Sequence, residues 1–161
     1  MRDILFRGQT RRKGEKVWMD GTPVDSNWVE GYGVCMGKGD FSVIYAGDHV
    51  EKFPVYTDTV GQFTGLTDKN GKKIFEGDLL NGFQYPFYRS ESAEHNYFAE
   101  VIWFTGNCAF GLYTHKHPTA RVRGISAGNA DFIEDFNSDD WEVIGNIHDN
   151  PELLGGTEDG K

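Results

Sequence analysis

The stretch TVGQFTGLTDKNGKKIFEGDLL, from Thr59 to Leu80, alternates short apolar runs with turn-forming residues. Its DKNG segment, at 68–71, has the composition of a tight turn, because Asp can bond to its own backbone while Asn and Gly tolerate a positive φ. The pair Ile74-Phe75 follows, and Glu76-Gly77-Asp78 predicts a second bend. Strands this short, joined by turns this tight, favour a small antiparallel β-barrel.

The preceding and following sequence alternates in the same way. Phe41–Tyr45 and Phe98–Phe104 predict strands, and the second is apolar on both faces, which indicates a central strand covered on two sides. Trp28–Met36 predicts a further strand, in which Gly31 and Gly33 indicate a bend or bulge.

The remaining elements are shorter. Pro54 fits an edge strand or the start of a strand, because it has no N–H to donate to a central ladder. Asp131–Phe136 predicts a short helix, and Trp141–Ile147 predicts a closing strand. Pro151 is placed to open one helical turn after it.

The composition agrees with a mainly β fold. The chain has 161 residues, of which 21 are Gly and 14% are aromatic. Large rings supply buried area to short strands, and glycine serves the turns between them. We expect one mainly β domain over residues 1–154, with an N-terminal β region at 1–57, a barrel region at 58–154 and a disordered tail at 155–161.

The formal net charge of −9 is unevenly spread. Residues 1–16 hold six Lys or Arg against two Asp or Glu, whereas residues 131–161 hold ten acidic residues against one Lys. We expect the basic run to form an exposed connection between two strands, at Ile4-Leu5-Phe6 and at Val17-Trp18-Met19. The overall charge disfavours nucleic acid as a partner, because phosphate binding needs a cationic face.

The cysteine and hydropathy patterns predict a cytoplasmic protein. Only three apolar residues follow Met1-Arg2-Asp3, so we expect no signal peptide, and no apolar run reaches the roughly 18 residues of a membrane helix. Cys35 and Cys108 are therefore expected to be reduced and buried, although a pairing between them stays open.

Two motifs resemble the YopX family of bacteriophage and prophage proteins. The first runs through residues 59–66, 68–71 and 74–78 of the opening stretch, and the second comprises Glu142–Ile147 and Asn150–Leu154. The pattern around Ile4–Gly8 and Trp18-Met19 is also similar. The resemblance spans most of the chain, from Arg2 to about Leu154.

The resemblance implies a phage or prophage protein that is mainly β and antiparallel. An N-terminal β-hairpin or meander region would pack with a C-terminal SH3-like β-barrel that carries one or two short helical turns. It implies no reaction, no cofactor and no catalytic residue. The motif glycines, including Gly61, Gly65, Gly71, Gly77 and Gly145, serve backbone geometry in this interpretation.

An aromatic stretch supplies the candidate binding residues. The segment 81–97 predicts a long loop rich in residue types that are common at protein interfaces. Its candidates are Phe83, Tyr85, Phe87, Tyr88 and Arg89. The alternative is that these rings fold back over the barrel.

Signals for chemistry are weak. His115 and His117 lie at i and i+2, but no third metal ligand is identifiable. The series Asp135, Asn137 and Asp139 departs from a calcium loop at its sixth and twelfth positions. Glu76 and Asp78 flank a glycine bend, where carboxylates usually accept backbone N–H groups. We therefore expect no enzyme activity, no metal and no cofactor.

The sequence thus favours a non-enzymatic protein-interaction module. Its partner would be a second copy of the chain or a host or phage protein. The alternative is nucleic-acid binding by the basic segment, with phosphate contacts from Arg7, Arg11, Arg12, Lys13 and Lys16. A metal-dependent enzyme is a third and weaker hypothesis.

Overall fold

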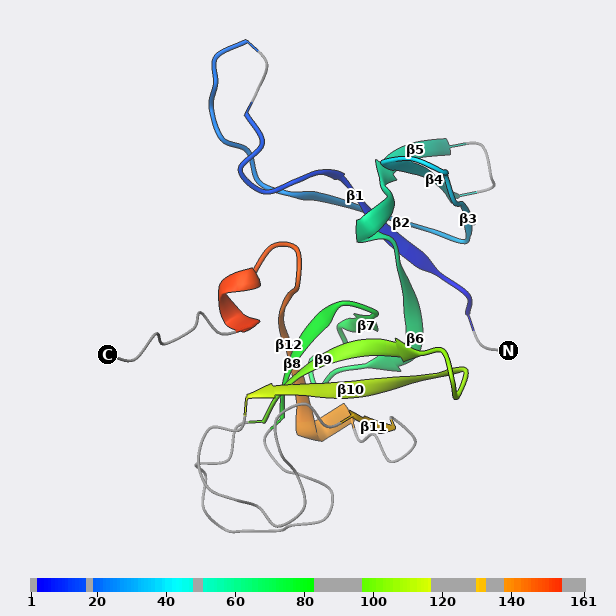
Figure 1. The fold of residues 1–161 in the computed structure, drawn as a ribbon, viewed down its shortest axis with the longest axis vertical. Helices are drawn as coiled ribbons and strands as arrows, with labels where there is room; N and C mark the ends of the chain where they lie inside the picture. Colours follow the sequence, from blue (N-terminus) through cyan, green and yellow to red (C-terminus); the bar gives the residue numbers. More distant parts are fainter. Residues whose placement is uncertain are drawn as a thin grey trace. The chain divides into compact units, whose positions relative to one another are not determined.

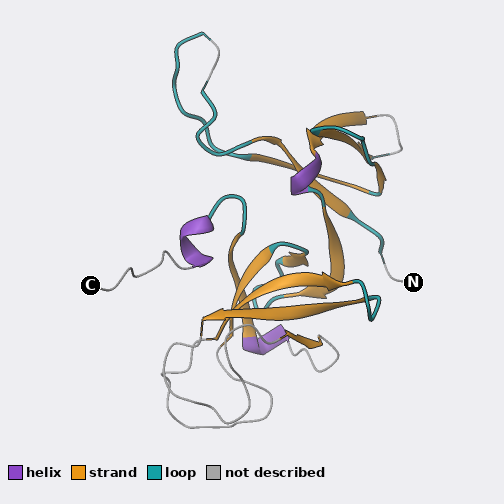
Figure 2. Cartoon of the chain, viewed as in Figure 1, coloured by secondary structure: helices purple, strands orange, loops and turns teal. Residues whose placement is uncertain are grey.

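The computed structural model describes residues 3–16, 19–47, 51–82, 97–116, 130–132 and 138–154. The chain divides into two units, Met1–Gly65 and Leu66–Lys161. The described part is mainly β and antiparallel, as the sequence predicts, and its helical structure is limited to short 3-10 turns (Figures 1 and 2). The tail at 155–161 lies outside the described residues.

The first unit contains two small groups of paired strands. Strand β1 (Phe6–Arg11) pairs antiparallel with β2 (Asn27–Gly31) and with the start of β6 (Gly61–Thr67). Strands β3 (Gly33–Cys35), β4 (Phe41–Ala46) and β5 (Glu51–Tyr56) form a separate three-stranded sheet. The 3-10 turn η1 (Thr57–Thr59) connects β5 to β6.

The bend predicted within Trp28–Met36 is confirmed, because that run is divided between β2 and β3. Gly31 ends β2, and a Cβ at this position would collide with the carbonyl oxygen of Tyr45. The same carbonyl accepts the N–H of Tyr32 at 3.1 Å. A side chain at Gly31 would therefore push apart the backbone contact that carries the chain from one sheet to the other.

Edge and interior positions in this unit follow elementary rules. Pro54 lies on β5, an edge strand of the three-stranded sheet, as predicted. Ile44 and Val55 are fully buried, and they leave no room for a side chain at Gly8. The buried Gln9 donates its backbone N–H to the hydroxyl of Thr59 at 2.9 Å, so this backbone donor is satisfied inside the unit.

The second unit is built on a curled half-barrel sheet. Its strand order is β11 (Ala130–Phe132), β10 (Ala109–Lys116), β9 (Tyr97–Phe104), β8 (Asp78–Gly82) and β12 (Trp141–Asn146). The short strand β7 (Lys73–Phe75) precedes β8, and the turns η3 (Ser138–Asp140) and η4 (Pro151–Leu154) flank β12. The helical turn predicted at Pro151 is thus confirmed.

Apolar side chains from β7 to β12 form the core of this sheet. The buried cluster comprises Ile74, Leu80, Ala99, Val101, Phe110, Leu112, Trp141 and Val143. The register of β12 against β8 shifts between Val143 and Gly145. Ile144, which alternates with the buried Trp141 and Val143, is 39% exposed.

Several sequence predictions are wrong. Trp103 is 41% exposed, so the central strand β9 is not covered on two sides at that end. Residues 131–132 belong to strand β11 and not to a helix, because they pair with β10. Arg7 and Arg11 lie within strand β1 and not in a basic loop, because β2 supplies a partner for them.

The cysteine prediction is also wrong. Cys35 and Cys108 are free and exposed. Cys35 lies on an edge strand, and Cys108 lies in the turn between β9 and β10, with φ of 50°. Thiols are commonly buried because they are apolar, but the two backbone positions are set here by strand order and hairpin geometry.

Candidate functional site

The three-stranded sheet of the first unit has a mainly apolar face that points away from its buried residues. Ser42 and Ile44 of β4 are buried, so Phe41, Val43 and Tyr45 lie on the opposite face. Directly paired residues of neighbouring strands point to the same side. The strand register therefore extends this outer face, which comprises Cys35, Phe41, Val43, Tyr45, Lys52, Pro54 and Tyr56.

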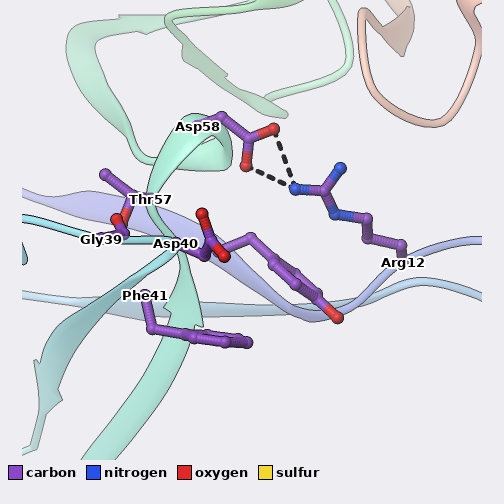
Figure 3. A pocket seen from close by; sticks show the side chains of 7 residues that line it. Arg12, Gly39, Asp40, Phe41, Thr57 and Asp58 are labelled. Atoms are coloured by element: carbon purple, nitrogen blue, oxygen red, sulfur yellow. Dashed lines mark hydrogen bonds and ion pairs between the residues drawn. The ribbon is translucent and has the colours of Figure 1, made fainter.

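One end of the outer face opens into a pocket of about 490 Å³ (Figure 3). The pocket is lined by Arg12 and by residues 39–41 and 56–58. Thr57 holds the two short segments together: its backbone N–H donates to the carbonyl of Asp40 at 2.8 Å, and its hydroxyl donates to the carbonyl of Gly39 at 2.9 Å. The pocket thus has a fixed backbone frame.

Arg12 covers one wall of this pocket. Its guanidinium carbon lies 4.2 Å from the centre of the Tyr56 ring, and its Nη2 donates to both carboxylate oxygens of Asp58 at 2.7 and 2.9 Å (Figure 3). The ring of Phe41 lies 5.0 Å from the ring of Tyr56. An exposed ion pair contributes little to the stability of a fold. The contacts of Arg12 with Tyr56 and Asp58 therefore matter mainly because they form the wall of the pocket.

Glu15 links Arg12 and Tyr56, which both line the pocket. One carboxylate oxygen accepts the backbone N–H of Arg12 at 3.1 Å, and the other accepts the hydroxyl of Tyr56. This hydrogen bond raises the pKa of Tyr56 above its ordinary value, and partial burial and the charge of Glu15 act in the same direction. Tyr56 therefore stays a neutral aromatic surface at physiological pH.

Asp40 is the carboxylate of the pocket that the fold leaves available. No described residue forms a hydrogen bond or an ion pair with its side chain, whereas Asp58 is paired with Arg12. With one cation and two carboxylates in its lining, the pocket has a net charge of −1. It therefore attracts cations and repels phosphate.

The five basic residues suggested as phosphate contacts lie in different environments. Arg7 stacks over the Trp28 ring at 4.7 Å, and Arg12 is engaged in the pocket. Arg11, Lys13 and Lys16 are exposed. The structure thus places four of the five at the surface, although Arg12 is already paired with Asp58, and Arg7 is half-buried against Trp28.

Other predicted residues lie outside the described part of the chain. These include the candidate loop residues Phe83, Tyr85, Phe87, Tyr88 and Arg89, and also His117, Asp135 and Asn137. Within the described ranges, no group of three or more His, Cys, Asp or Glu side chains is placed to hold a metal ion. No described helix has the length and apolarity that a membrane span needs.

The acidic residues of the opening motif bind the backbone. Asp78 accepts the N–H of Phe75 at 2.8 Å, as predicted for a carboxylate beside a glycine bend. Asp68 accepts the N–H groups of Asn70 and Lys72 through one oxygen and that of Val143 through the other, at 2.8, 2.9 and 3.0 Å. These two carboxylates organise turns through backbone hydrogen bonds.

The second motif is also structural. Asn146 accepts the N–H groups of His148 and Asp149 at 3.0 and 2.9 Å, and Asn150 accepts the N–H of Asn146 at 3.3 Å. A Cβ at Gly145 would collide with the amide of Asn150. The residues that make the motif distinctive therefore shape the turn after β12.

The YopX protein family model matches residues 37–155, which include both motifs and most of the described strands. The chain belongs to the YopX family. No match was found among curated proteins. Among solved structures, the chain is similar to protein EF1440 from Enterococcus faecalis, with 22% identity, a TM-score of 0.39, and coverage of 94% of this chain and 97% of that chain.

The pocket of this YopX protein is not predicted by the sequence. Two of its lining residues have other predicted roles: Arg12 is a phosphate contact in the alternative nucleic-acid hypothesis, and Phe41 begins a strand. The one available signal was the apolar alternation of Phe41, Val43 and Tyr45, which indicates a strand with an aromatic face. Nothing in the sequence indicates that Arg12 would stack on Tyr56, which is 44 positions away.

Proposed function

We propose that this YopX protein is a non-enzymatic protein-binding module of a phage or prophage, active in the host cytoplasm. Its partner docks on the outer face of the β3-β4-β5 sheet. The partner is a host or phage protein, and self-association through the same face is the alternative. The proposal agrees with two observations. The motif carboxylates Asp68 and Asp78 bind backbone N–H groups, and the aromatic outer face is exposed to solvent.

The observation that carries the proposal is the exposure of the outer face. Phe41 is 56% exposed although β4 is the central strand of the sheet, and Cys35 and Pro54, which pair with Val43 on the same face, are exposed as well. Aromatic residues are enriched in protein interfaces, and charged residues are depleted at their centres. On this face, Lys52 is the one charged side chain, and it lies over the Tyr45 ring at 5.8 Å.

A charge placed at the centre of the outer face tests the proposal. Val43→Glu puts a carboxylate beside Cys35 and Pro54, so we expect loss of partner capture from a lysate of the host, with the captured protein identified by mass spectrometry. Met19→Glu is the matched control, because Met19 is 89% exposed in the same unit but lies outside the sheet. Equal capture by the two variants contradicts the proposal.

Light scattering separates the two kinds of partner. A mass of 18.1 kDa at all concentrations indicates a monomer that binds another protein, whereas a multiple of that mass that Val43→Glu reduces indicates self-association. A strict monomer that captures nothing rules out both versions.

The aromatic loop remains a separate proposal. The partner could also bind the loop candidates Phe83, Tyr85, Phe87, Tyr88 and Arg89. In that case the double variant Phe87→Ser, Tyr88→Ser should capture the partner at least fivefold more weakly than the wild-type protein does, corresponding to about 1 kcal/mol. Unchanged capture would assign the rings to covering the protein's own surface.

Nucleic-acid binding stays a second candidate, favoured by the surface position of Arg11, Lys13 and Lys16. It predicts binding of a labelled single-stranded or duplex DNA that weakens steeply with salt. Replacing the three residues by Gln should reduce the slope of log K against log salt by about 2 to 3. Absence of any anisotropy change at 20 mM salt would eliminate this candidate.

A further inference from the structure

We propose that the pocket at the end of the outer face receives an arginine side chain from a basic segment of the partner. This inference rests on the proposed function and adds the chemical class of the partner. The evidence is the combination of an exposed aromatic ring, an available carboxylate and an arginine of the chain itself that is already bound in the same way.

The aromatic contribution comes from Phe41. Phe41 is 56% exposed, and its ring centre lies 5.0 Å from that of Tyr56, so the two rings form an apolar floor that is reached from solvent. A guanidinium group is planar and weakly hydrated, and it stacks on aromatic faces more readily than a compact ammonium group does. The floor therefore favours arginine over lysine.

The charge contribution comes from Asp40. Asp58 is occupied by Arg12, which leaves the exposed carboxylate of Asp40 as the acceptor for a second cation in the pocket. Glu15, which bonds to the lining residues Arg12 and Tyr56, adds a further negative charge next to them. An incoming guanidinium would thus meet a carboxylate beside an aromatic ring, which is the pairing that arginine recognition uses.

Arg12 gives an example of this recognition within the chain. Its guanidinium lies over Tyr56 and forms two hydrogen bonds to Asp58. The incoming arginine would stack on Phe41 as Arg12 stacks on Tyr56, and it would bind Asp40 as Arg12 binds Asp58. The backbone frame formed by Thr57 holds Asp40 and Phe41 in position before the partner arrives (Figure 3).

The position of the pocket favours a polypeptide over a free cation. Phe41 and Tyr56 belong to the pocket and also to the outer face, so residues next to the arginine can lie on Val43 and Pro54. The pocket volume of about 490 Å³ lies within the range of ordinary ligand pockets. A free cation would use the pocket and leave the apolar face unoccupied.

The test uses the full chain, labelled with ¹⁵N, and three blocked peptides. These are Ac-Val-Gly-Arg-Gly-Val-NH₂ and the same peptide with Lys or Glu at its centre. We expect the arginine peptide to shift the amide signals of Gly39, Phe41 and Thr57 in a saturable way, with the lysine peptide at least threefold weaker and the glutamate peptide without effect. Asp40→Asn should weaken binding of the arginine peptide at least threefold.

Asp25→Asn is the matched control. It removes the same charge from an exposed position of the same unit that does not line the pocket, and it should leave binding unchanged. The inference is overturned if the arginine peptide shifts none of the three signals at 10 mM, or if the two Asn variants bind it equally. Guanidinium chloride at the same concentrations reports whether a free cation alone produces the shifts, which would overturn the choice of a peptide.

The outcomes also separate this inference from the proposed function. If Val43→Glu abolishes partner capture while the arginine peptide does not bind, the docking face stands and the arginine inference fails. If Val43→Glu has no effect on capture and the peptide still binds at Asp40, the pocket stands and the docking face fails.

Discussion

At the scale of single residues, Asp68 connects the first motif to the last strand. Its carboxylate is 3% exposed and accepts three backbone N–H groups, one of them from Val143, 75 positions away in the chain. Burial by itself raises the pKa of Asp68, but the hydrogen bonds from Val143, Lys72 and Asn70 outweigh burial and leave its pKa below the ordinary value.

This arrangement predicts acid-sensitive stability. A carboxyl group whose pKa is lowered in the folded state stabilises the fold above its unfolded pKa, near 4, and the contribution is lost as the pH falls through the lower, folded pKa. Asp68→Asn keeps the shape of the side chain, but its amide N–H group would face the backbone N–H of Val143, and two donors cannot bond to each other. We expect a loss of about 1–3 kcal/mol at pH 7 and a flatter decline of stability toward pH 2, measured by urea unfolding.

The control for this prediction is Asp25→Asn, which replaces an exposed carboxylate. Its unfolding free energy should change by less than about 0.5 kcal/mol. Equal pH dependence in wild type and Asp68→Asn would contradict the role given to Asp68.

The exposed cysteines allow a second prediction at this scale. Because Cys35 and Cys108 are free and exposed, Ellman's reagent should modify two thiols per native chain without denaturant. Cys35→Ser and Cys108→Ser should each reduce the count by one. If the thiols react only after urea is added, both cysteines are buried in the native protein and the prediction is wrong.

At the scale of elements, the break between β2 and β3 divides the first unit into two sheets. One continuous stretch, Trp28–Met36, supplies strands to two sheets because Gly31 lets the backbone approach Tyr45. A glycine also sets the path of the chain in the second unit. Gly77, with φ of 81°, lies in the tight bend between β7 and β8.

Substitution of Gly31 tests this account. Gly31→Ala forces a methyl group against the Tyr45 carbonyl, so we expect a destabilisation of about 1–3 kcal/mol in urea unfolding. Gly106→Ala is the control, because its Cβ would meet open space and its backbone needs no positive φ. Similar unfolding midpoints for the two variants would show that the close approach is not required.

At the scale of the whole molecule, charge controls association. The chain carries a net charge of −9 at pH 7 and has a pI near 4.9. Net charge keeps proteins apart, and its loss promotes association. We therefore expect light scattering from the purified protein to peak near pH 5 and to fall toward pH 8, while a specific oligomer formed through the outer face would persist at pH 8. Scattering that rises steadily with pH would contradict this.

Local features of the fold could be predicted from the sequence. The turn at 68–71, the bend at Glu76-Gly77-Asp78 and the edge position of Pro54 each depend on a few neighbouring residues whose φ preferences and missing donors act over short distances. The family motifs add little about function, since Asp68, Asn146 and Asn150 are used by the backbone.

The candidate site depended on contacts between distant parts of the chain. Arg12 meets Asp58 and Tyr56 only because β1 and the end of β5 are brought together, and Asp40 reaches Thr57 only because β4 pairs with β5. The exposure of Cys35 likewise follows from its place on an edge strand.

The amino-acid sequence by itself determined the mainly β class, the turn positions and the YopX membership of this protein, because turn chemistry and alternation are properties of neighbouring residues. Tertiary structure alone decided which face of the small sheet meets solvent and which pocket carboxylate, Asp40, forms no side-chain bond with another described residue. Those two properties arise from strand order and register, which join residues that local preferences cannot relate.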